Sequence, residues 1–125
     1  MSFSNSRINQ YTNALKNFED AINEPIDNAR DEAGVVKLFE LCFELSWKCI
    51  KHKLEASEGF AIKSPRDAIN KAYATSLINN EELWLKMIVS RNESTHIYES
   101  EGMTKLIKVF PSYLKLFKEL LNNLK

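Results

Sequence analysis

The segment that decides the fold is residues 31–57, DEAGVVKLFELCFELSWKCIKHKLEAS. Its apolar side chains recur at helical spacing and cover more than half of the helix circumference, which is more than one neighbouring helix needs. Such a wide apolar face is typical of the central helix of a bundle, or of a helix that also meets a second chain. We therefore predict a long central helix that ends near Gly59 in a left-handed cap.

Helices are also predicted on both sides of this segment. The stretch before Asn23 carries a single apolar stripe with steps of three and four residues. Ser64-Pro65-Arg66-Asp67 has a capping serine and a proline at the first helical position, which together are a strong start signal. The helix that begins there fades near Ile78 and restarts at Asn80, so we expect it to be interrupted.

The last predicted helix, about residues 100–122, contains Pro111, which should kink it or split it near Lys108. The chain holds only 3 Gly and 3 Pro, too few turn-forming residues for a many-stranded barrel or sandwich. We predict an all-α fold, an up-and-down antiparallel four-helix bundle with the third helix interrupted and the last kinked. Residues 1–125 should form a single domain.

Charge and hydropathy exclude several classes of protein. The 17 basic and 17 acidic side chains balance, which argues against a broad basic face for nucleic acid. Residues 1–62 hold 7 basic and 10 acidic side chains and residues 63–125 hold 10 and 7, so an anionic substrate is expected nearer the C-terminal half. The longest apolar runs are about four residues, and the first residues lack a signal-peptide core. We expect a cytoplasmic protein without membrane contact.

The cysteines and histidines do not suggest a metal site. Cys42 and Cys49 are seven residues apart on one predicted helix, roughly 10 Å between Cα atoms, too far for a disulfide. They share a face and are expected to be small buried apolar residues. With His52 and His96 as the only histidines, no zinc site of standard spacing can form, and we expect no cofactor. His52 lies between two lysines and is expected to be solvated.

The segment richest in reactive groups is residues 91–98, RNESTHIY. Arginine is a permanently charged, forked donor for phosphate, and histidine titrates near pH 6.5 and can transfer protons. Arg91 and His96 would be sufficient for metal-free RNA cleavage, with histidine moving the proton and arginine stabilising the charge on the phosphate. The alternative is that both are ordinary polar residues at a helix end, where a histidine is favourable near the negative pole.

Helical geometry restricts how these residues can act together. In one unbroken helix, Arg91 and His96 point about 140° apart and cannot meet at one phosphate. Either the helix breaks between them or twofold pairing of two chains brings both copies into one cleft. Arg91 and Tyr98, seven residues apart, share a face.

The order of the motifs resembles a known family. Arg-x4-His-x-Tyr, here Arg91, His96 and Tyr98, is similar to the motif of HEPN-domain proteins, in particular HepT-type toxins. Over about residues 5–122, further motifs resemble the branch called nucleotidyltransferase substrate-binding proteins; these are FELSWK at 43–48, Gly59, SPRD at 64–67, Trp84 and Arg91-Asn92. The resemblance implies a HEPN-like helical bundle that forms a homodimer, with a partner gene for a minimal nucleotidyltransferase.

The resemblance allows two functions. One is a metal-independent endoribonuclease toxin, with Arg91 and His96 of both chains as catalytic residues and Asn92 as a supporting polar residue. The nucleotidyltransferase is then the antitoxin and adds AMP to Tyr98, and a short or structured RNA such as a tRNA end suits the neutral chain as substrate. The alternative is a non-catalytic subunit that binds substrate for a two-component nucleotidyltransferase, because both descriptions attach to the same motif.

Overall fold

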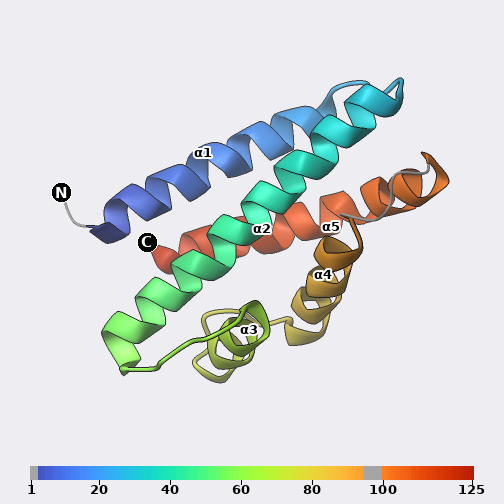
Figure 1. Ribbon diagram of the computed structural model, residues 1–125. Helices are drawn as coiled ribbons and strands as arrows, with labels where there is room; N and C mark the ends of the chain where they lie inside the picture. Colours follow the sequence, from blue (N-terminus) through green and yellow to red (C-terminus); the bar gives the residue numbers. More distant parts are fainter. Residues whose placement is uncertain (1–2, 95–99) are drawn as a thin grey trace.

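The computed structural model describes residues 3–94 and 100–125, and side chains over residues 6–94 and 102–125. This part of the chain is all helical and contains α1 (Phe3–Asn23), α2 (Ala29–Glu58), α3 (Pro65–Ala74), α4 (Glu81–Ser94) and α5 (Ser100–Leu124) (Figure 1). The predicted all-α fold is confirmed, and the predicted third helix is indeed interrupted, as α3 and α4. Among the described residues, no helix combines the length and apolar character needed to cross a membrane.

Helix α2 is the centre of the bundle, as its wide apolar face predicts. It contacts each of the other four helices, and α1, α2 and α5 also contact one another in pairs. We call these three helices the three-helix layer. Helix α3 contacts α2 and α4, and within the described residues it does not reach α1. Figure 1 shows α1 and α2 side by side in opposite directions, with α3 and α4 beside the layer.

Aromatic side chains fill the middle of the three-helix layer. Phe18 of α1 packs edge-on against Phe110 of α5 with ring centroids 5.2 Å apart, and Phe39 of α2 stacks on Phe110 at 4.9 Å. Phe117, further along the same face of α5, lies 5.9 Å from Phe18 and 5.8 Å from Trp84 of α4. All five side chains are buried. The rings therefore connect α1, α2, α4 and α5 in one core.

The helix ends use the predicted signals. Gly59 has φ 72°, in the left-handed region that glycine adopts without strain, and it ends α2. The Ser64 hydroxyl accepts a hydrogen bond of 3.1 Å from the Asp67 amide at the start of α3. The Asn80 side chain accepts one of 3.1 Å from the Leu83 amide at the start of α4. These caps set where the two short helices begin.

Of the kink or split predicted at Pro111, the split does not occur, because α5 runs through this residue from Ser100 to Leu124. Pro111 is exposed on the outside of the bundle. A carbonyl that loses its amide donor there can be hydrated, so the helix continues at a smaller cost than in the interior. The next residue, Ser112, donates a hydrogen bond of 2.6 Å back to the Val109 carbonyl.

Candidate functional site

Three separate sequence segments meet in one groove of about 380 Å³ between α2, the start of α3 and α4. The groove is lined by Phe43, Glu44, Trp47, Ser64, Pro65, Arg66, Ile88, Arg91 and Asn92. We call it the motif groove, because all of its lining except Ile88 comes from FELSWK, SPRD and Arg91-Asn92, the segments that carry the family resemblance. The fold thus gathers side chains that are far apart in the sequence.

The α2–α3 connection is held against α2, and this positions one rim of the motif groove. The Glu55 carboxylate on α2 accepts a hydrogen bond of 3.0 Å from the Ile62 amide and pairs with Lys51 at 3.0 Å. Ile62 is buried. The chain therefore returns to α2 before Ser64 caps α3, and Arg66 follows on the exposed first turn.

The opposite rim is fixed through the end of α4. Ser94 is buried, and its hydroxyl lies 2.5 Å from a carboxylate oxygen of Glu40 on α2 and 2.7 Å from the Arg91 carbonyl oxygen. Ile88, one turn before Arg91, is buried as well. The residues that flank Arg91 on α4 are therefore fixed against the core, and the half-buried side chain of Arg91 lines the groove.

The Glu44 carboxylate lines the groove and interacts with two neighbouring side chains of α2. It accepts a hydrogen bond of 3.1 Å from the Trp47 indole and pairs with Lys48 Nζ at 3.1 Å. Partial burial alone would raise the pKa of Glu44, but the hydrogen bonds from Trp47 and Lys48 and the charges of Lys48 and Arg91 outweigh it and lower that pKa. Glu44 is therefore ionised at neutral pH and orients the indole.

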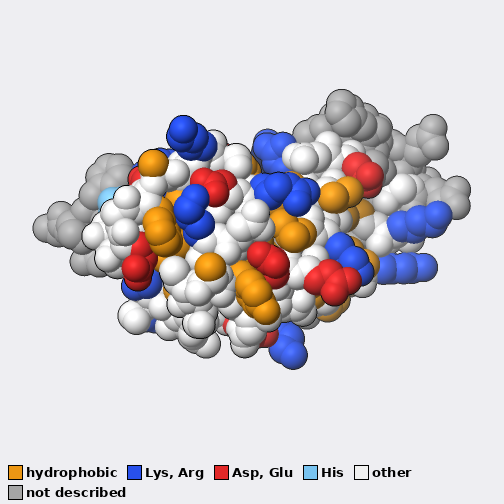
Figure 2. All heavy atoms as spheres, turned by 90° about the horizontal axis from the view of Figure 1, so that it is seen from below, with side chains coloured by type: hydrophobic (Ala, Val, Ile, Leu, Met, Phe, Trp, Pro, Cys, Tyr) orange, Lys and Arg blue, Asp and Glu red, His pale blue; other side chains and the backbone are white. Residues whose placement is uncertain are grey.

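The groove combines groups that suit an anion carrying a flat ring. Arg66 and Arg91 are forked donors that match phosphate or carboxylate, and Trp47 offers an aromatic surface. Figure 2 shows basic and acidic side chains interspersed over one face of the molecule, so positive charge there is local. Over residues 3–94 and 100–125, no three His, Cys, Asp or Glu side chains gather as a metal-binding group.

The predicted site residues have different outcomes. Arg91 and Asn92 both line the motif groove. His96 and Tyr98 lie outside the described residues, so the meeting of Arg91 with His96, within one chain or across a dimer, stays a prediction.

Trp47 is the groove residue that sequence reasoning missed. Like Trp84 and Met87, it stands at helical spacing among apolar residues, which favours a core position, and those two are buried. Trp47 is only partly buried and lines the groove. The signal that could have shown this is Glu44 three residues earlier, a carboxylate acceptor for the indole on the same face.

The family model described as nucleotidyltransferase substrate binding protein like matches residues 6–125. The chain belongs to this family. The resemblance to the nucleotidyltransferase substrate-binding branch is thereby confirmed, whereas the resemblance to HepT-type toxins is compatible with it and stays a prediction. Every residue that lines the motif groove lies within residues 6–125, the part of the chain that the family model matches.

Two solved structures share the fold of this family member. A protein from Thermus thermophilus superposes with a TM-score of 0.86 at 23% identity, covering 92% of this chain and 98% of that one. A Haemophilus influenzae protein, described as having the fold of a substrate-binding domain of a nucleotidyltransferase, gives 0.83 at 22% identity and covers 94% and 98%. Both likenesses show the common helical bundle. No curated protein matches the chain in sequence.

Proposed function

We propose that this chain is the non-catalytic, substrate-binding subunit of a two-component nucleotidyltransferase whose catalytic chain is encoded separately. The observation that carries the proposal is the motif groove, where the segments typical of the substrate-binding family come together around Trp47 and Arg91. In this role the groove holds the acceptor substrate and presents it to the catalytic chain.

Each side chain of the groove has a role that follows from its geometry. Arg66 and Arg91 stand on α3 and α4 and bind an anionic group of the substrate between them. The Trp47 indole, oriented by Glu44, stacks on a ring, and the Asn92 amide can donate and accept hydrogen bonds.

The test uses the separately encoded nucleotidyltransferase chain that the proposal requires. The two purified chains should elute from a sizing column as one complex, and the complex should transfer nucleotide to its acceptor faster than the transferase alone. Arg91→Ala or Arg66→Ala should reduce this stimulation about 10-fold, the loss expected for one charge-assisted hydrogen bond.

The matched control is Lys86→Ala, which removes an exposed cation from α4 outside the groove and should leave the stimulation intact. Failure of the two chains to associate, or stimulation that is indifferent to both arginine variants, would contradict the proposed function.

A HepT-like metal-independent endoribonuclease is the second candidate. It is supported by the Arg91, His96 and Tyr98 spacing and by the position of Arg91 in a groove instead of in the core. In this function a homodimer cleaves RNA with Arg91 and His96 of both chains, and Asn92 supports them. The minimal nucleotidyltransferase silences it by adding AMP to Tyr98, which would block the anion site beside Arg91.

Expression of the chain alone separates the two functions. The ribonuclease arrests growth, and Arg91→Ala or His96→Ala relieves the arrest, whereas the substrate-binding subunit leaves growth unchanged in every case. After co-expression with the nucleotidyltransferase, mass spectrometry should find Tyr98 unmodified for a binding subunit. An added AMP on Tyr98, absent from Tyr98→Phe, favours the ribonuclease.

A further inference from the structure

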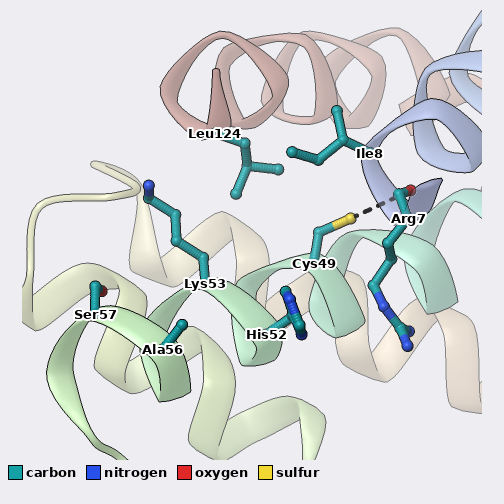
Figure 3. Close-up of a pocket in the computed structure, with 8 residues that line it drawn as sticks. All are labelled: Arg7, Ile8, Cys49, His52, Lys53, Ala56, Ser57 and Leu124. Atoms are coloured by element: carbon teal, nitrogen blue, oxygen red, sulfur yellow. Dashed lines mark hydrogen bonds between the residues drawn. The ribbon is translucent and has the colours of Figure 1, made fainter. Parts of the chain in front are cut away.

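A second hollow region opens between α1, α2 and the end of α5 (Figure 3). Its larger part has a volume of about 370 Å³, and an adjoining part has about 270 Å³. Both parts are lined by Arg7 and His52, so we treat them as one site, the α1–α2 cavity. It shares only Trp47 with the motif groove and is therefore a separate site.

Basic side chains line the α1–α2 cavity, and Figure 3 shows Lys53 and Arg7 pointing to opposite ends with His52 between them. Arg7, His52 and Lys53 line the larger part, and its described lining residues include no carboxylate. The adjoining part has one carboxylate in its lining, Glu55, which already binds Lys51 Nζ at 3.0 Å. A hollow with this imbalance of charge attracts anions.

One wall of the α1–α2 cavity is apolar. Ile8 of α1 and Leu124 of α5 extend towards the same space, with Cys49 of α2 beneath them (Figure 3). The Cys49 Sγ lies 3.7 Å from the Arg7 carbonyl oxygen, which ties the start of α1 to α2. Burial raises the pKa of Cys49 to about 11, so this wall carries a neutral thiol at physiological pH.

The size and mixed character of the cavity restrict its ligand. Small-molecule sites are clefts of roughly 300–1,000 Å³ with apolar walls and a few converging polar groups. An inorganic anion would use the cations alone, and an apolar molecule would use the apolar wall alone. An amphipathic anion uses both.

We propose that the α1–α2 cavity binds a small organic phosphate of about mononucleotide size. The phosphate is held by His52 and by the flexible side chains of Arg7 and Lys53, which reach it from opposite ends, through charge-assisted hydrogen bonds. The organic part packs against Ile8, Cys49 and Leu124. This site does not depend on the proposed function of the motif groove, because a different set of cations forms it.

The test is calorimetric titration of the purified chain, without any transferase, with AMP, adenosine and inorganic phosphate. AMP should bind, and adenosine and inorganic phosphate should each bind at least about 10-fold more weakly, since each lacks one half of the recognition. Arg7→Met and Lys53→Met, which keep an apolar stem, should each weaken AMP binding about 10-fold. Lys37→Met, on the exposed face of α2 outside the cavity, should bind AMP as the wild type does.

Amide spectra locate the bound AMP and complete the test. Bound AMP should shift the amide signals of residues 49–57, whose side chains include much of the lining. The proposal is overturned if AMP does not bind, if it shifts only signals of the motif groove, or if both methionine variants bind normally. Inorganic phosphate binding as tightly as AMP would equally overturn it. Circular dichroism checks the fold of each variant, and Lys53→Met serves if Arg7→Met fails to fold.

Discussion

The three-helix layer and α3 are held in place by different means. The layer packs large rings from α1, α2 and α5 against one another, as in the 4.9 Å stack of Phe39 on Phe110. Helix α3 has 10 residues, and its buried face is Ala68, Ile69 and Ala72. The layer therefore holds most of the packing free energy, whereas α3, which supplies a rim of the motif groove, depends more on its cap. The rim of the motif groove that carries Arg66 thus sits on a lightly packed helix, which is supported by a heavily packed layer.

The largest loss of stability is expected from Phe117→Ala in the three-helix layer. Phe117 is fully buried and contacts rings from α1, α2 and α4. Its truncation should lower the free energy of unfolding by about 3–5 kcal/mol, the usual cost of a cavity left by a buried phenylalanine. Chemical denaturation measures the loss, and Val109→Ala on the exposed side of α5 is the control, with less than about 0.5 kcal/mol. If Phe117→Ala lowered the free energy of unfolding by less than Ser64→Ala does, the conclusion that the layer holds most of the packing free energy would be contradicted.

Alkaline pH should also destabilise the three-helix layer. Burial raises the pKa of Cys42 to about 12 and that of Cys49 to about 11. It also raises the pKa of Tyr11, whose hydroxyl donates a 2.7 Å hydrogen bond to the Phe117 carbonyl. In the unfolded chain these groups lose their protons at lower pH than in the native chain, so stability present below pH 9 is lost as pH rises.

For Cys42 alone, the loss between about pH 9 and pH 11 should be on the order of 2 kcal/mol. Denaturation curves at successive pH values measure it. Cys42→Ala should show a shallower decline over this range, whatever its stability at neutral pH. Equal slopes for the variant and the wild type would show that this thiol does not contribute to the decline.

In α3, the larger effect should come from the cap. Ser64→Ala removes the acceptor for the Asp67 amide and should cost about 1 kcal/mol. Hydrogen exchange should show this loss in the amides of α3, with α5 unchanged, because the layer does not depend on the cap. Ser112→Ala on the exposed side of α5 is the control. Uniform loss of protection across all helices would mean that α3 and the layer open together.

The layer was predictable because its determinants are local. The apolar spacing of residues 31–57 is a property of one helix. Because it makes an apolar face wider than one neighbour covers, it predicts the central position that α2 occupies. Of the kink or split predicted at Pro111, the split does not occur, because the cost of a proline inside a helix depends on which side of the helix faces solvent. That side is decided by packing and not by the proline itself.

The sites were less predictable, because their residues come from different elements. Arg91 and Asn92 could be selected by their chemistry, but only the fold places Trp47 and Arg66 beside them. The charge of each half-chain predicts an anion site nearer the C-terminal half, where Arg66 and Arg91 of the motif groove lie, whereas the basic side chains of the α1–α2 cavity lie in the N-terminal half. A sum of charge over half of the sequence does not show which basic side chains the fold gathers around one cavity.

The smallest effect should come from the Lys71–Asp67 pair within α3, at 2.7 Å. The hydrogen bond from Lys71 is the main cause that lowers the pKa of Asp67. Stability from this pair is therefore present above the ordinary carboxyl range and is lost as pH falls through it. Lys71→Met should reduce α3 protection at neutral pH by less than Ser64→Ala does, because the pair is solvent-accessible.

Lys71 also lies over the Phe60 ring, 5.6 Å from its centroid, so a single comparison at neutral pH would mix two losses. The ring contact does not need the Asp67 carboxylate, so it persists at an acidic pH below the lowered pKa of Asp67. The difference between wild type and Lys71→Met at neutral pH, minus the difference at the acidic pH, therefore belongs to Asp67. Unfolding midpoints at the two pH values measure it, with Lys86→Met in the 3.8 Å exposed pair of α4 as control. If the two differences are equal, the ring contact and not the ion pair is what Lys71 contributes to α3.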